Sequence, residues 1–197
     1  IVQRRLLDAV RHAERRTDFG TERRFDHIGH AQDAVLRVHV LIFINAAQAY
    51  NVNEVYLLSH AILESGWGTS LLARGQVEGY EGYYNFFGIG AYDADPLNGG
   101  AALAKQRAWD SVEKAILGAA QWISSGYLHD EPFAQNTLYK MKWDIYNAMK
   151  HDNPWHQYAT DPTWQLKIAR IMATLYIREG IAISDTGLIF DIPMYRK

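Results

Sequence analysis

The 197-residue chain contains no cysteine, so its fold depends on neither disulfide bonds nor a controlled redox environment, which suits an exported protein. It has no excess of one charge either. The formal net charge is −2, whereas dedicated nucleic-acid-binding proteins present basic surfaces. No apolar run is long enough to cross a membrane, and there are no internal repeats or low-complexity segments. With 48% apolar residues, the sequence therefore predicts a globular domain with a sizeable core.

The N-terminal region is basic and amphipathic. Its arginines interrupt any apolar core of a signal peptide and would form the solvated face of a helix over residues 1–18. His27 and His30 lie three positions apart, but no carboxylate or cysteine pattern completes a metal site, so we predict surface histidines. Because the chain begins with Ile1 and not methionine, we expect a fragment of a longer precursor.

Apolar residues recur at helical spacing in several later segments. They predict helices over 34–50, 54–65, 111–124 and 162–178. Asn and Glu at 51–54 form a helix-start signal, and Ser111 is a good N-cap. The glycine-rich, aromatic segment 74–100 predicts an extended or hairpin structure, and 126–162 is loop-rich. The fold class expected is mainly α with a small irregular or β-hairpin segment.

Glu64 stands at the end of an apolar helical run and directly before a Gly-Trp-Gly-Thr turn at 66–69. A carboxyl group placed there would be half buried, which raises its pKa and allows it to donate a proton near neutral pH. His60 lies one turn earlier on the same face, but the pattern is not His-Glu-x-x-His, which argues against a zinc peptidase. A structural glutamate capping the turn is the alternative. The apolar run and the rigid turn favour a catalytic acid.

A second motif spans 84–93, Tyr-Asn-Phe-Phe-Gly-Ile-Gly-Ala-Tyr-Asp. Its two glycines allow the backbone to approach a ligand closely. Asn85 can bind an amide or a hydroxyl group, and Asp93 supplies a second carboxylate. A tight turn that packs aromatic rings against the core explains the composition equally well.

Amide side chains alternate with aromatic rings in a third motif at 135–143 and 156–160, a mixture that is common in carbohydrate sites. Tyr158 could form a hydrogen bond to a charge that develops on a sugar. The alternative for these residues is a surface loop with ordinary aromatic anchors.

Together these motifs resemble the glucosaminidase domain of bacterial cell-wall autolysins, glycoside hydrolase family 73, in the branch of the staphylococcal bifunctional autolysins. The resemblance runs from about 43 to 180, with a further match near Phe-Asp-Ile-Pro at 190–193. Besides the motif at 84–93, four segments carry the resemblance: Tyr-Asn-Val-Asn-Glu-Val-Tyr-Leu at 50–57, His-Ala-Ile-Leu-Glu-Ser-Gly-Trp-Gly-Thr-Ser at 60–70, Gln-Asn-Thr-Leu-Tyr-Lys-Met-Lys-Trp at 135–143 and His-Gln-Tyr-Ala-Thr at 156–160. It implies a lysozyme-like helical fold with the irregular segment lining a cleft. It also implies hydrolysis of the β-1,4 bond between N-acetylglucosamine (GlcNAc) and N-acetylmuramic acid (MurNAc) in peptidoglycan, a mannosyl-glycoprotein endo-β-N-acetylglucosaminidase-like activity.

The resemblance assigns roles to individual residues. The expected catalytic residues are Glu64, Asp93 and Tyr158, and the expected substrate-binding residues are Trp67, Asn85, Phe87, Gln135 and Tyr139. Trp67 departs from the asparagine of many relatives. We expect no metal and no cofactor.

The resemblance also divides the chain into an N-terminal helical extension at 1–38 and a catalytic domain at 39–197. The expected partner is the peptidoglycan glycan strand, with no nucleic acid and no membrane insertion. We expect a monomer that is secreted or associated with the cell wall.

Three routes for the reaction stay open. An inverting enzyme holds water between carboxyl groups about 6.5–9.5 Å apart, and a retaining enzyme with two carboxylates needs about 5 Å. The third route, slightly favoured, uses the 2-acetamido group of the substrate as nucleophile, with Glu64 as the acid. A lytic transglycosylase of the same fold, a non-catalytic wall-binding module and a histidine-based metal amidase are the alternatives.

Overall fold

The computed structural model describes residues 40–91 and 94–178 and contains no strand within them. The elements are α3 (Val40–Ala49), α4 (Glu54–Glu64), α5 (Leu71–Arg74), α6 (Pro96–Gln106), α7 (Val112–Ile123), a π-helical turn (Ser124–Leu128), α8 (Leu138–Trp143), α9 (Ile145–His151) and α10 (Trp164–Arg178). The expectation of a mainly α fold is confirmed. The predicted N-terminal helix, His27, His30 and Asp93 lie outside the described residues.

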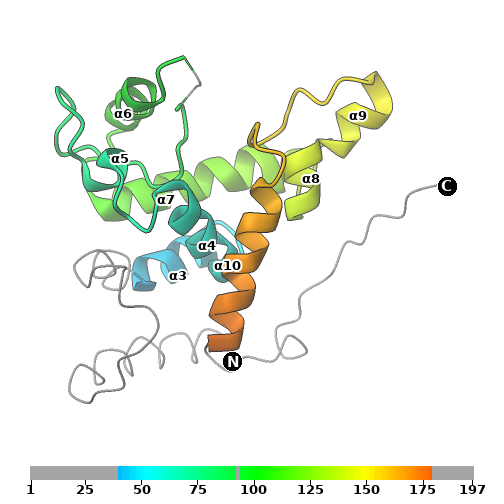
Figure 1. Cartoon of the computed structure of the whole chain (residues 1–197), viewed down its shortest axis with the longest axis horizontal. Coiled ribbons are helices and arrows are strands. Elements are labelled where there is room, and N and C mark those ends of the chain that lie inside the picture. The colour runs from blue at the N-terminus through cyan, green and yellow to red at the C-terminus, as the bar shows by residue number, and fades with distance from the viewer. Residues whose placement is uncertain (1–39, 92–93, 179–197) are drawn as a thin grey trace.

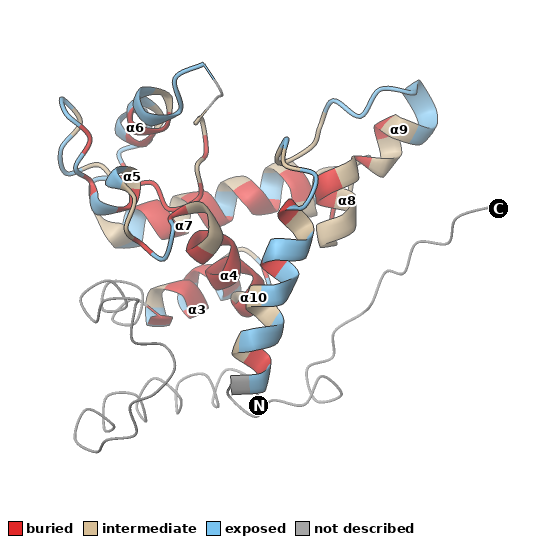
Figure 2. Ribbon diagram, in the orientation of Figure 1, coloured by how far each residue is buried: buried red, intermediate tan, exposed pale blue. Residues whose placement is uncertain are grey.

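Helix α4 lies at the centre of the arrangement, with α3 and α10 packed against it (Figure 1). It begins where predicted, because the Asn53 side chain accepts a hydrogen bond of 2.8 Å from the backbone N–H of Tyr56. It ends at Glu64, with Ser65 as its C-cap, just before the predicted Gly66 turn. Almost the whole of α4 is buried, whereas α10 has one exposed face (Figure 2). A residue at the end of α4 therefore emerges directly from the core.

The glycine-rich segment after α5 adopts the irregular form and not the hairpin. Five of its glycines have positive φ angles, which break any continuous strand ladder: Gly75, Gly79, Gly82, Gly88 and Gly90. Helix α6 then begins at Pro96, within the segment 74–100 that was predicted to be extended. Asp95 caps it, and proline suits the first helical position.

The region 126–162, predicted to be rich in loops, contains α8 and α9. These helices have six and seven residues, too few turns for a helical period to stand out in the sequence. Local caps define them instead, since Thr137 and Asp144 accept hydrogen bonds from the backbone N–H of Lys140 and Asn147. In Figure 1 these two helices lie on the opposite side of α4 from α5 and α6.

Close packing inside the helical core generates a first prediction. A Cβ added to Gly118 in α7 would lie 2.1 Å from Nε1 of the buried Trp109. Although alanine is the better helix former, we expect Gly118→Ala to lower the free energy of unfolding by roughly 2 kcal/mol because the indole must move. Urea denaturation measures this change. Gly126→Ala is the control, since no atom of the described part of the chain lies within 4 Å of its added Cβ. Equal stability of both variants would contradict the prediction.

Candidate active site

Glu64 is the last residue of α4, and its side chain is 25% exposed. Its Oε1 accepts a hydrogen bond of 2.7 Å from the indole Nε1 of Trp164, the first residue of α10. Burial raises the pKa of Glu64, whereas the Trp164 N–H favours the carboxylate and acts in the opposite direction. The half-buried acid predicted from the sequence is therefore present, and its protonation is set by competing interactions.

A charged pair adds to these effects. The Lys167 ammonium lies 2.5 Å from Asp161 Oδ2, and Thr163 donates to Asp161 Oδ1. The bond from Lys167, followed by those from Thr163, lowers the pKa of Asp161 to about 2, so this carboxyl is ionised. The negative charge of Asp161 raises the pKa of Glu64, and the positive charge of Lys167 lowers it. The sequence motifs did not reveal Asp161.

His60 lies behind Glu64 and is fully buried. Burial lowers its pKa to about 3, so the imidazole is neutral and forms no ion pair with Glu64 Oε1, which is 3.7 Å from Nε2. The imidazole meets three aromatic rings edge-on, with centroids 5.3 Å from Phe87, 4.5 Å from Tyr158 and 5.2 Å from Trp164. His60 is thus the centre of an aromatic cluster from four segments of the chain.

The structure brings Tyr158 into this cluster, next to Trp164, which donates a hydrogen bond to Glu64. Its ring stacks on Trp164 at 5.0 Å with an interplanar angle of 20°, and its hydroxyl donates to the carbonyl of Phe87 at 3.3 Å. Burial raises the pKa of Tyr158 well above its usual value, so the phenol keeps its proton. Its backbone N–H donates to the carbonyl of Met141 at 3.0 Å, which ties the segment to α8.

A buried lysine holds the following residues in place. The ammonium of Lys142, also in α8, donates to the carbonyls of Ala159 at 2.7 Å and Thr160 at 3.3 Å. These bonds satisfy a charge that would otherwise be costly to bury. They fix the backbone between Tyr158 and Asp161, so both side chains are presented from one braced segment.

The second motif also approaches Glu64 closely. A Cβ on Gly88 would lie 3.4 Å from Glu64 Oε2, and Gly88 has a φ angle of +63°, which side chains rarely adopt. The backbone of this motif can therefore pass beside the carboxyl group, as its glycines suggested.

The predicted substrate-binding residues fall into different environments. Asn85, Phe87 and Gln135 are each 1% exposed. The Asn85 amide donates to the carbonyls of Ile89 and Gly100 and accepts from Phe87 N–H. The Gln135 amide donates to the carbonyls of Lys140 and His156 and lies 2.7 Å from His156 Nδ1. Both amides are bonded within the protein, and their contact with a sugar stays a prediction.

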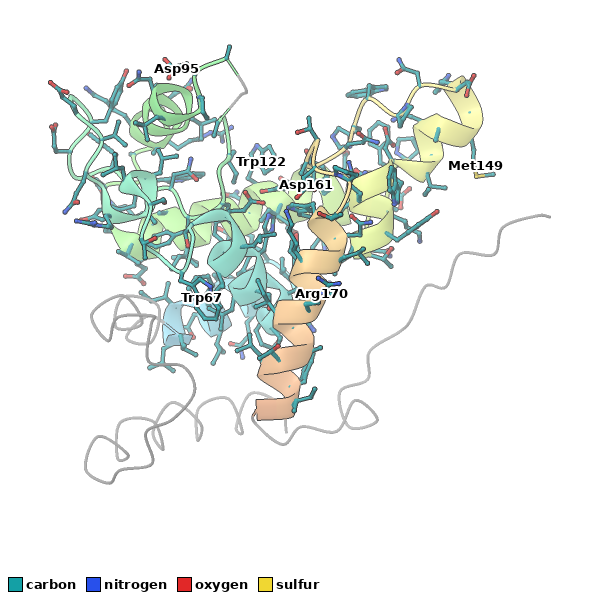
Figure 3. All side chains as sticks on the ribbon, viewed as in Figure 1. Trp67, Asp95, Trp122, Met149, Asp161 and Arg170 are labelled. Carbon is teal, nitrogen blue, oxygen red and sulfur yellow. The ribbon has the colours of Figure 1, made fainter. Side chains whose placement is uncertain are left out.

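The two remaining residues of that set are less enclosed. Tyr139 is half-buried in α8. Trp67 is 39% exposed with a φ angle of +61°, and it lies well apart from Trp122 and Asp161 in Figure 3. Trp122, which the motifs did not include, lies with its ring 6.0 Å from Tyr158. The predicted Asp93 lies outside the described residues.

Two absences apply to the described part of the chain. No group of three or more His, Asp or Glu side chains in residues 40–91 and 94–178 could hold a metal ion. Over the same ranges, no helix has the length and apolar character needed to cross a bilayer.

Residues 40–177 match the family model described as mannosyl-glycoprotein endo-beta-N-acetylglucosaminidase. The chain belongs to the glucosaminidase family. This domain is 42% identical to a beta-N-acetylglucosaminidase of Bacillus subtilis and 45% identical to a bifunctional autolysin of Staphylococcus aureus. The matches cover 84% and 78% of the chain but only 18% and 12% of those relatives.

The glucosaminidase domain also resembles solved structures. A catalytic mutant of S. aureus autolysin E in complex with the disaccharide NAG-NAM matches with a TM-score of 0.61 and 36% identity, over 77% of this chain and 68% of that one. The major bifunctional autolysin matches with a TM-score of 0.52 and 46% identity, over 79% and 60%.

The Trp164 hydrogen bond gives a prediction that needs no activity assay. Trp164→Phe removes the N–H that stabilises the ionised carboxyl, so the pKa of Glu64 should rise further. NMR titration of the labelled Glu64 carboxyl measures the change. Trp155→Phe, at a side chain that is 61% exposed, is the control and should leave the pKa of Glu64 unchanged. A lower pKa of Glu64 in Trp164→Phe would contradict this account.

Proposed function

We propose that this glucosaminidase-family domain hydrolyses the β-1,4 bond between GlcNAc and MurNAc in peptidoglycan, with Glu64 as general acid. The observation that carries the proposal is the half-buried Glu64 carboxyl, with its raised pKa and its bond to Trp164. The names of the relatives point to the same chemistry, and an autolysin E structure also contains the muropeptide NAM-L-Ala-D-iGlu.

In the first step, Glu64 donates its proton to the glycosidic oxygen as the bond to C1 of GlcNAc breaks. The carboxylate that forms keeps its hydrogen bond from the Trp164 N–H, which stabilises the negative charge as it develops. This donor is held by the aromatic cluster and needs no reorganisation. MurNAc leaves with a free 4-hydroxyl group.

The nucleophile in our proposal is the 2-acetamido group of GlcNAc. Its carbonyl oxygen attacks C1 and forms a cyclic oxazolinium ion. Water then opens this ion, and the Glu64 carboxylate takes the proton of that water. Tyr158 and Asp93 would orient the acetamido group or stabilise its charge; the position of Tyr158 beside Trp164 supports its part in this role.

The remaining assignments follow from the same proposal. Trp67, Asn85, Phe87, Gln135 and Tyr139 would shape the sugar site, directly or through the segments they hold. The domain would act as a monomer on glycan strands, in a secreted or wall-associated protein. No cofactor enters the mechanism.

Replacing the acid tests the assignment of Glu64. Glu64→Gln should lower hydrolysis of purified cell walls by at least ~10²-fold, because an amide cannot donate the proton. The free energy of unfolding at neutral pH should stay within ~1 kcal/mol or rise, since Gln keeps an oxygen for Trp164 and removes a charge that is costly to bury.

Asp93→Asn and Tyr158→Phe should lower turnover less than Glu64→Gln does. Unchanged turnover in Glu64→Gln would overturn the assignment of Glu64 as the acid, whereas a wild-type domain that binds walls without cleaving them would favour the wall-binding module. A loss of stability above ~3 kcal/mol would indicate a structural buried pair.

The products decide between the remaining reactions. We expect new reducing ends on GlcNAc, with retained anomeric configuration in NMR spectra recorded directly after cleavage. Anhydro-MurNAc ends in mass spectra would instead establish a lytic transglycosylase. Inverted configuration would exclude the acetamido route while leaving Glu64 as the acid.

A further inference from the structure

A buried hydrogen-bonded chain lies behind Glu64, and the mechanism above does not use it. His60 Nδ1 is 3.0 Å from the hydroxyl of Tyr56, and that hydroxyl is 3.2 Å from Sδ of Met141 in α8. All three side chains are buried. The other nitrogen, His60 Nε2, has no hydrogen-bond partner among residues 40–91 and 94–178 and faces Glu64 Oε1 at 3.7 Å.

The hydrogen bonds assign the tautomer of His60. The thioether sulfur of Met141 can only accept, so the single O–H of Tyr56 points to it. The Tyr56 oxygen is then free to accept, and His60 Nδ1 must carry the proton that it donates. The opposite tautomer would lose the bond to sulfur and leave a buried N–H donor at Nε2, which is more costly than an unmet acceptor.

Distances around Glu64 Oε1 agree with this assignment. The indole Nε1 of Trp164 lies 2.7 Å from this oxygen, the distance of a short N–H···O hydrogen bond. His60 Nε2 is 1.0 Å farther away, at 3.7 Å against 2.7 Å. An N–H at Nε2 would be drawn to the same oxygen, whereas a lone pair keeps its distance from another acceptor. His60 therefore presents a lone pair to the acid.

We propose that Met141, Tyr56 and His60 form a positioning chain that keeps the proton on Glu64 until the sugar takes it. The lone pair of His60 disfavours negative charge on Oε1. Because Oε1 accepts from Trp164, the proton resides on Oε2, the oxygen beside Gly88. The inference rests on the proposed function, in which Glu64 is the acid. His60 touches no reacting atom in this scheme and acts through Glu64.

Met141→Leu, the main variant below, and its control Met172→Leu replace none of the other titratable groups around Glu64. Asp161 and Lys167 are paired with each other and act in opposite directions on the carboxyl. Burial keeps Tyr56 and Tyr158 protonated, since it raises the pKa of each well above the usual value. A change in Glu64 titration can therefore be attributed to the imidazole.

The first test is the tautomer itself. NMR of the nitrogen-labelled wild-type domain should show that His60 is protonated at Nδ1 and unprotonated at Nε2. Met141→Leu removes the sulfur acceptor with little change in volume, so the Tyr56 O–H should turn to Nδ1 and shift the imidazole proton to Nε2. A wild-type His60 protonated at Nε2 would overturn the inference.

The second test is the titration and turnover of Glu64. In Met141→Leu, the new Nε2–H donor should stabilise the carboxylate and lower the pKa of Glu64. In the pH profile of kcat, the alkaline limb should then move to lower pH, with a several-fold loss of kcat on that limb. KM should stay within about twofold of the wild-type value. Tyr56→Phe removes the oxygen that accepts from His60 Nδ1. We therefore expect the imidazole proton to move to Nε2 and the pKa of Glu64 to fall, as in Met141→Leu.

Met172→Leu is the matched control, because this α10 methionine packs against the same core. It should change neither the tautomer of His60 nor the alkaline limb. A purely structural role would alter stability in Met141→Leu and leave the limb in place, and that result would overturn the inference.

The two proposals fail in different ways. If Glu64 titrates as expected in these variants but the wild-type domain releases no sugar ends, the proposed hydrolysis is wrong, while the effect of Met141, Tyr56 and His60 on the protonation of Glu64 stands. If hydrolysis occurs and the Glu64 titration is the same in Met141→Leu as in the wild type, the positioning chain is wrong.

Discussion

The hydrogen bond from Trp164 to Glu64 joins two residues one hundred positions apart, at the end of α4 and the start of α10. Its geometry requires the two helices to pack directly against each other, as they do. The same indole supports the stacked ring of Tyr158, so the acid and the neighbouring phenol share one scaffold. The position of each group depends on this contact.

A general acid must bind its proton strongly enough to hold it in water and weakly enough to release it to a sugar. In the proposed role of Glu64, burial would provide the first property, since it raises the pKa, and the Trp164 N–H would provide the second, since it lowers the pKa. Burial alone would hold the proton too tightly, and hydrogen bonding alone would release it before the substrate arrives. The site thus combines two opposing effects on one carboxyl, where a change in either partner shifts the balance.

The sequence predicts those features that local chemistry determines. The start of α4 at Asn53 and the cap of α7 at Ser111 follow from side chains within three residues of the bonds that they accept. Glu64 stands out because an apolar run and a turn flank it. The partners of Glu64 do not stand out, since Trp164 and Asp161 belong to the start of a different helix and carry no periodic signal of their own. Only the packing of α10 on α4 relates them to the acid.

Polar residues in the motifs predicted to line the sugar site have structural partners within the protein. The amides of Asn85 and Gln135 tie irregular backbone to neighbouring helices, since they also donate to Gly100 in α6 and Lys140 in α8. Together with Lys142, they satisfy carbonyl groups that lie outside the helices, at Ile89, His156 and Ala159. Motifs rich in amides and glycine therefore mark irregular backbone that must be held rigidly near the acid. We infer that the first contribution of these motifs is to hold the backbone around Glu64 in shape, because the rings around His60 keep their positions only while these segments do.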